Sequence, residues 1–128
     1  ICHSNSFSIK AVLDWELSTL GHPLADLGYF LYAHYIPYGE RHGLKGANLG
    51  ELNIPNVDNL VNEYCKVRKI KNFDPTFYVV LSLFRSIAIL EGVYARFVNG
   101  NESSATAKDI GKDVEPLANA TYDIIKRL

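Results

Sequence analysis

The sequence has little of several features that assign a protein to a class at once. It contains no Met, one Trp and two Cys among its 128 residues. Cys2 and Cys65 are too few and too far apart for a disulfide framework or a zinc site, so we expect reduced thiols. That usage predicts an intracellular protein and leaves cytoplasmic, mitochondrial and peroxisomal locations open.

A strong excess of either charge is also missing. Lys and Arg number 13 against 14 Asp and Glu, a net charge of −1. A nearly neutral chain attracts neither nucleic acid nor an anionic membrane in bulk, so we expect no nucleic-acid or membrane partner.

No long uncharged apolar run is present. The longest, from Phe77 to Leu90, is interrupted by Ser82, Arg85 and Ser86 and falls short of the roughly 18 apolar residues that a membrane span needs, so it predicts a buried helix. The N-terminus lacks the basic start and apolar stretch of a secretory signal, and we expect none.

What is present is the composition of one globular domain, with 48% apolar and 21% charged residues. Alternation over residues 7–13 predicts a strand, the second arm of a hairpin begun near residues 1–3. Pro23 suits a helix start and predicts a helix over residues 23–36, followed by a glycine-rich surface loop over 37–56.

Apolar residues at helical spacing, together with residues that typically start or stop a helix, predict three more helices. They are expected over residues 55–68, from Asp74-Pro75 to Val98, and from Ser103 or Ser104 to residue 128, where Pro116 either kinks the helix or opens a new one. The predicted class is mainly α with a short N-terminal β-hairpin. Because a lone hairpin is marginally stable, it needs a partner surface from these helices or from another part of the protein.

Three acids lie in the stretch AVLDWELSTLGHPLADLGYF, residues 11–30. Asp14 at a strand end would project its carboxylate beyond the sheet edge, where it suits Mg²⁺; the alternative is a turn cap. Glu16 points to the same side if the strand continues. Asp26 reads as a buried acid that organises a neighbouring loop, and metal binding is its secondary interpretation.

Other candidates are weaker. His22 at the corner reads as a surface turn residue, and no zinc site is predicted. Glu91 lies on a helical stripe with Leu81, Phe84, Ala88 and Ala95, where a charge needs a partner or a cavity. Arg85 and Arg96 share a face that is either solvated and ion-paired or anion-binding.

The acidic stretch, together with FRSIAILEGVYARFVNGN and VEPLA, resembles the aminoglycoside phosphotransferase family, closest to the kinase-like domain fused to some acyl-CoA dehydrogenases. The resemblance implies the C-terminal helical lobe of a protein-kinase-like fold. It assigns Asp14 to the Mg²⁺ that bridges the ATP phosphates and Asp26 to a brace of the catalytic loop. Glu16 and Glu91 become candidates for supporting or substrate contacts, while His22 replaces the family's usual Asp.

The family's His-Gly-Asp-x-x-x-x-Asn loop and nucleotide-binding lobe find no counterpart in residues 1–128. We therefore expect a partial domain that, when whole, uses ATP and Mg²⁺ to phosphorylate a small-molecule hydroxyl, such as a hydroxyacyl-CoA, and that is inactive alone. The alternative is a non-catalytic scaffold or acyl-binding module. Expected partners are a fused acyl-CoA dehydrogenase domain or a second copy that covers exposed apolar surface.

Overall fold

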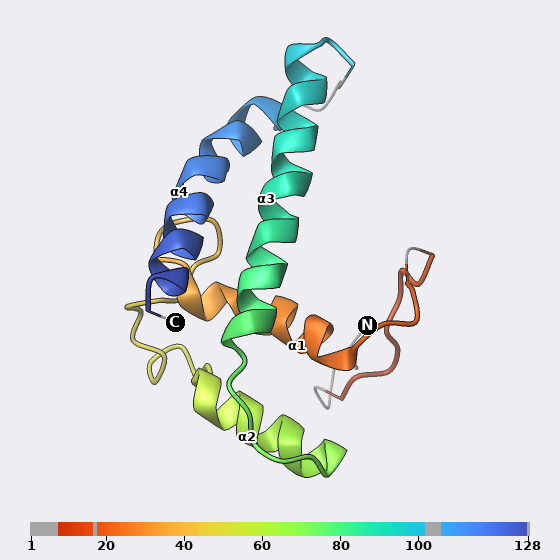
Figure 1. Ribbon diagram of the computed structural model, residues 1–128, viewed down its shortest axis with the longest axis vertical. Helices are drawn as coiled ribbons and strands as arrows, with labels where there is room; N and C mark the ends of the chain where they lie inside the picture. Colours follow the sequence, from red (N-terminus) through yellow and green to blue (C-terminus); the bar gives the residue numbers. More distant parts are fainter. Residues whose placement is uncertain (1–7, 17, 102–105, 128) are drawn as a thin grey trace.

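The computed structural model describes residues 8–16, 18–101 and 106–127. Within them lie the helices α1 (Pro23–Leu31), η1 (Tyr32–Tyr35, a 3-10 helix), α2 (Val57–Arg68), α3 (Thr76–Val98) and α4 (Ala107–Ile125), as Figure 1 shows. The mainly helical class predicted from the sequence is confirmed.

The core forms where α1, α3 and α4 meet. Figure 1 shows α4 lying alongside α3, and α1 crossing beneath the start of α3. Leu31 of α1, Leu83 of α3 and Leu117 of α4 are each 0% exposed, so all three helices contribute fully buried side chains to one cluster. Burial of such side chains supplies most of the stability of short helices in water.

Small residues allow α1 and α3 to approach closely. A Cβ added at Gly28 would lie 2.4 Å from the carbonyl oxygen of Tyr78, a distance that real Cβ atoms do not adopt. The buried hydroxyl of Ser82 donates to the Tyr78 carbonyl at 2.8 Å and approaches the Ala25 carbonyl at 3.4 Å. The crossing therefore depends on a glycine and a serine at the contact.

The helix boundaries agree with their sequence signals. Asn56 caps α2 by accepting from the Asn59 N–H at 2.9 Å, and Lys69 ends it in the left-handed conformation. The helix expected over 23–36 changes to a 3-10 turn after Leu31 and stops before Pro37. Pro116 lies inside α4, so one helix continues through it.

The predicted hairpin is not seen. Among the described residues, 8–13 form no strand, and backbone pairing in this stretch is limited to an isolated β-bridge at Ile9. The first arm, near residues 1–3, lies outside the described residues. The backbone turns left-handed at Asp14, with φ of 68°, and the Trp15 indole N–H donates to the Val12 carbonyl at 2.7 Å. These local contacts bend the segment, whereas a strand needs a neighbour along its length.

The long helix α3 is buried on one side only. Val79, Ser82, Leu83, Ser86 and Leu90 are buried, whereas large apolar side chains such as Phe77, Phe84, Ile89 and Val98 are exposed. By length and composition this helix, among the described residues, could cross a membrane, a test that core helices of soluble proteins also pass. The prediction of a buried helix is right for one face and wrong for the other.

Candidate functional site

The acid segment, which we define as residues 11–22 without residue 17, carries the predicted metal ligands Asp14 and Glu16. It leads into α1 and lies beside the N-terminal end of that helix (Figure 1). Asp14 is exposed, and its carboxylate forms no hydrogen bond or ion pair with a described residue. Among the described residues, Asp14 therefore caps no turn, which was the alternative interpretation.

Local hydrogen bonds shape the backbone around Asp14. The Ser18 N–H donates to the Trp15 carbonyl at 2.9 Å, and the Ser18 hydroxyl donates to the same oxygen at 2.6 Å. Together with the Trp15 contact to Val12, they fold the segment into a compact bend. Asp tolerates the left-handed backbone of such a bend better than most residues do.

The donor set of the acid segment fits Mg²⁺. Glu16, like Asp14, is exposed and makes no hydrogen bond or ion pair with a described residue. Mg²⁺ commonly takes one or two protein carboxylates and completes its shell with water and substrate phosphates. Among the described residues, no group of three or more His, Cys, Asp or Glu is placed to hold a metal by itself.

His22 has a structural role that the sequence did not predict. It is exposed, as expected, but it is also the N-cap of α1, with Nδ1 accepting from the Leu24 N–H at 3.4 Å. Its ring stacks on Tyr78 of α3 with centroids 5.4 Å apart and an angle of 13°. His22 therefore attaches the end of the acid segment to the helical core.

Asp26 is exposed, so the prediction of a buried acid is wrong. Its position in the first turn of α1 leaves the carboxylate at the rim of a groove of about 430 Å³. The groove lies between α1 and α2 and is lined by Asp26, Leu27, Phe30, Leu60, Glu63, Tyr64 and Val67. Whether Asp26 braces a catalytic loop stays a prediction.

Glu91 lies on the exposed face of α3. Leu81, Phe84, Ala88 and Ala95 share that face, as the spacing predicted, but all of them are exposed. Since water solvates Glu91, its charge needs neither the partner nor the cavity that the sequence suggested. Asp14, Glu16, Asp26 and Glu91 are not joined by any hydrogen bond or ion pair among the described residues.

A second cavity was not found from the sequence. It encloses about 260 Å³ between η1, the following loop and the end of α4, and its lining includes Lys45 and Arg127. Burial, followed by the charges of Asp74 and Asp58, raises the pKa of Tyr35 in its wall. Residues so far apart in the chain share a cavity only because the fold brings them together, and no spacing rule could have predicted it.

Comparison with known proteins shows a relationship to longer chains. The chain is 41% identical over 126 residues to acyl-CoA dehydrogenase family member 10 of Mus musculus, covering 96% of this chain and 12% of that protein. It is 38% identical over 133 residues to family member 11 of Gallus gallus, covering 100% and 17%, and 36% identical over 129 residues to family member 11 of Homo sapiens, covering 99% and 16%.

Neither a protein-family model nor a solved structure matches the chain. The chain spans between 12% and 17% of the length of the curated relatives above. Identity of this level along nearly the whole chain establishes homology to one segment of those proteins. The chain is a homologue of part of acyl-CoA dehydrogenase family members 10 and 11.

Proposed function

We propose that this chain forms the C-terminal helical part of an ATP-dependent phosphotransferase whose acceptor is a small-molecule hydroxyl. The observation that carries the proposal is the exposed carboxylate of Asp14, which pairs with no described residue. It lies within a stretch that resembles the metal-binding segment of aminoglycoside phosphotransferases. The homologues are named as acyl-CoA dehydrogenase family members, so we favour a hydroxyacyl-CoA as the acceptor.

The role assigned to Asp14 follows from its charge and accessibility. Mg²⁺ bound to nucleotide phosphates neutralises charge as a phosphoryl group moves. Asp14 would supply one oxygen ligand, and Glu16 would act directly or through water in the same shell. Neither carboxylate has a competing Lys or Arg partner among the described residues, so both are available to a cation.

The same chemistry explains why residues 1–128 should not catalyse the reaction alone. Phosphoryl transfer depends on a positioned base and on groups that hold the nucleotide, and one or two carboxylates replace neither. We expect magnesium-dependent nucleotide binding to be weak in this chain and strong in a polypeptide extended by the coding sequence before Ile1.

The test measures ATP binding by calorimetry with and without Mg²⁺ in both polypeptides, and phosphoryl transfer to hydroxyacyl-CoAs in the longer one. Asp14→Asn should weaken magnesium-dependent binding at least tenfold, because it removes an anionic ligand. Asp58→Asn, an exposed acid at the start of α2, is the matched control and should change little.

Two results would overturn the proposal. One is magnesium-dependent binding in the longer polypeptide that Asp14→Asn leaves unchanged. The other is an absence of transfer to every hydroxyl acceptor tested when the nucleotide is bound.

A non-catalytic acyl-binding module is the second candidate, and the groove between α1 and α2 favours it. Leu27, Phe30, Leu60 and Val67 give this groove mainly apolar walls, as a fatty-acyl chain requires. Under this alternative, a fluorescent fatty acid should bind without Mg²⁺ or ATP. Phe30→Glu should abolish that binding, whereas Asp14→Asn should not affect it.

A further inference from the structure

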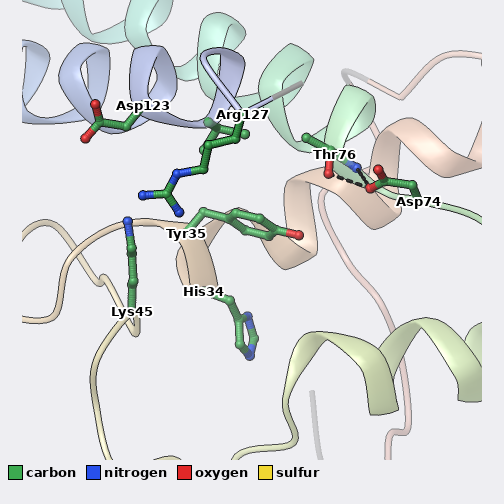
Figure 2. A pocket seen from close by; sticks show the side chains of 8 residues that line it. His34, Tyr35, Lys45, Asp74, Thr76, Asp123 and Arg127 are labelled. Atoms are coloured by element: carbon green, nitrogen blue, oxygen red, sulfur yellow. Dashed lines mark hydrogen bonds between the residues drawn. The ribbon is translucent and has the colours of Figure 1, made fainter.

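A cavity whose lining includes Lys45 and Arg127 lies at the opposite end of the α1–η1 helix from Asp14. The two ends are separated by the 9 residues of α1 and the 4 of η1, about 20 Å at the usual helical rise. Figure 2 shows this cavity, with Lys45 and Arg127 extending toward each other from opposite sides. The site is thus separate from the acid segment.

The two cations of this cavity are exposed and unpaired among the described residues. Neither the Lys45 ammonium nor the Arg127 guanidinium forms a hydrogen bond or an ion pair there. An anion placed between them would gain two attractions, which together outweigh the repulsion of the two like charges.

The carboxylates in the same lining do not neutralise this pair. Asp74 accepts from the Thr76 backbone N–H at 2.9 Å and from the Thr76 hydroxyl, contacts that fix it at the start of α3. Asp123 points away from the guanidinium in Figure 2, although it lies one helical turn before Arg127. These acids remain at the edges of the cavity and disfavour large polyanions there.

The loop that carries Lys45 is held in place. The Lys45 N–H donates to the Ile36 carbonyl at 2.9 Å, and the Tyr38 N–H donates to the Lys45 carbonyl at 2.9 Å. Arg41, in the same loop, pairs with Asp113 of α4 at 2.7 Å. The position of the Lys45 backbone therefore exists before any ligand arrives, which reduces the entropy cost of binding.

His34 and Tyr35 complete the lining on the η1 side. His34 Nε2 donates to the Pro55 carbonyl at 3.0 Å, which holds the ring in place. Nδ1 is buried and has no partner among the described residues. Burial, followed by the charges of Asp74 and Asp58, raises the pKa of the Tyr35 hydroxyl, which favours its neutral form.

From this arrangement we propose that the Lys45–Arg127 cavity binds a small molecule through one oxyanion group, a phosphate or a carboxylate. The planar guanidinium can donate two parallel N–H bonds to two oxygens of such a group, and the ammonium supplies a second point charge. A volume of about 260 Å³ admits a small ligand or the charged end of a larger one.

The test is an amide NMR titration of the 128-residue chain with sodium phosphate and, separately, with sodium acetate, at an ionic strength held constant with sodium chloride. We expect saturable shifts confined to the neighbourhood of His34, Lys45 and Arg127 with at least one of the two anions. The anion that saturates at the lower concentration identifies the oxyanion class.

Variants distinguish binding in this cavity from nonspecific screening of the protein's positive charge by the anions. Lys45→Gln combined with Arg127→Gln should weaken binding at least tenfold, whereas Lys45→Arg should keep it within about threefold. Arg68→Gln combined with Lys71→Gln removes the same charge outside the cavity and should leave binding unchanged. The amide spectrum of each variant reports whether it is folded.

Binding of both anions that fails to saturate, or that the Lys45/Arg127 double variant leaves unchanged, would show counter-ion screening alone and overturn the proposal. Asp14→Asn should have no effect on this titration. Failure here therefore leaves the proposed phosphotransferase function untouched, and failure of that function leaves this site untouched.

Discussion

The two ends of the α1–η1 helix differ in how their functional groups are held. At the N-terminal end, the acid segment places Asp14 and Glu16 in solvent, and hydrogen bonds within the segment itself shape its bend. At the C-terminal end, Leu31 and Ile36 are 0% exposed, and the loop after them is tied to α4 by Arg41.

This difference separates two kinds of binding site. Groups at the C-terminal end are arranged by the folded core, so a ligand meets a formed cavity. The carboxylates at the N-terminal end have no such support among the described residues, so a cation and a nucleotide would have to order them on binding. Substitutions should therefore lower the free energy of unfolding strongly where the helical core is involved and only weakly in the acid segment.

The largest expected effect contrasts a core leucine with a leucine of the acid segment. Leu83, 0% exposed, lies in the cluster that the C-terminal end of α1 joins, whereas Leu20 is fully exposed. Leu83→Ala should lower the free energy of unfolding by about 2–5 kcal/mol, and Leu20→Ala by less than about 0.5 kcal/mol. Denaturant unfolding followed by circular dichroism measures both, and equal losses would contradict the contrast.

Two glycines give the next contrast. Gly28→Ala would force Cβ against the Tyr78 backbone, while nothing lies within 4 Å of a Cβ at Gly21, before α1. Gly28→Ala should cost about 1–3 kcal/mol through overpacking, and Gly21→Ala should cost far less. Thermal unfolding of the two variants checks this, and a neutral Gly28→Ala would mean that α1 can move away from α3.

The sequence predicted the helices better than it predicted the site, for a physical reason. The apolar spacing of α2 and α3 and the Asp74-Pro75 start signal act within a few residues, so pattern alone places those helices. The exposure of Asp26 and Glu91 depends on which faces other helices cover, and periodicity does not state that. The meeting of Lys45 with Arg127 depends on the complete fold.

The strand prediction failed for a related reason. Alternation at residues 7–13 is compatible with a strand, but a strand exists only where another backbone pairs with it. In the described part of this segment, backbone pairing is limited to the isolated bridge at Ile9, and the chain bends at Asp14, where the Trp15 indole contacts Val12. The argument that a strand end projects the Asp14 carboxylate falls with the strand. The resemblance of the surrounding residues to a metal-binding segment does not depend on the strand and still makes Asp14 a candidate ligand.

A moderate, pH-dependent effect is expected at Asp74. Its hydrogen bonds from the side chain and backbone of Thr76 lower its pKa below the ordinary value of 3.8. The folded state therefore favours the carboxylate, so the stabilisation is complete above about pH 4 and is lost as the pH falls through the lowered pKa.

Asp74→Ala should cost about 1 kcal/mol near neutral pH, the usual loss for a helix-start acceptor, and less at pH 3. Thermal unfolding of the wild type and the variant from pH 7 to pH 3 measures the gap between them. A gap that stays constant across this range would show that the charge of Asp74 contributes nothing.

The smallest effect on global stability is expected at Asp14, where the acid segment can be separated from the core. Its φ of 68° suits Asn and Asp but is costly for Ala, by about 1 kcal/mol. If the segment opens independently of the helices, Asp14→Ala should speed hydrogen exchange of the amides near Trp15 and Ser18 while the melting temperature stays within error. Asp14→Asn should change neither quantity, which separates its use as a test of metal binding from any effect on folding. A drop of several degrees in the melting temperature of Asp14→Ala would instead show that the segment unfolds together with the core, and the contrast between the two ends of α1–η1 would then fail.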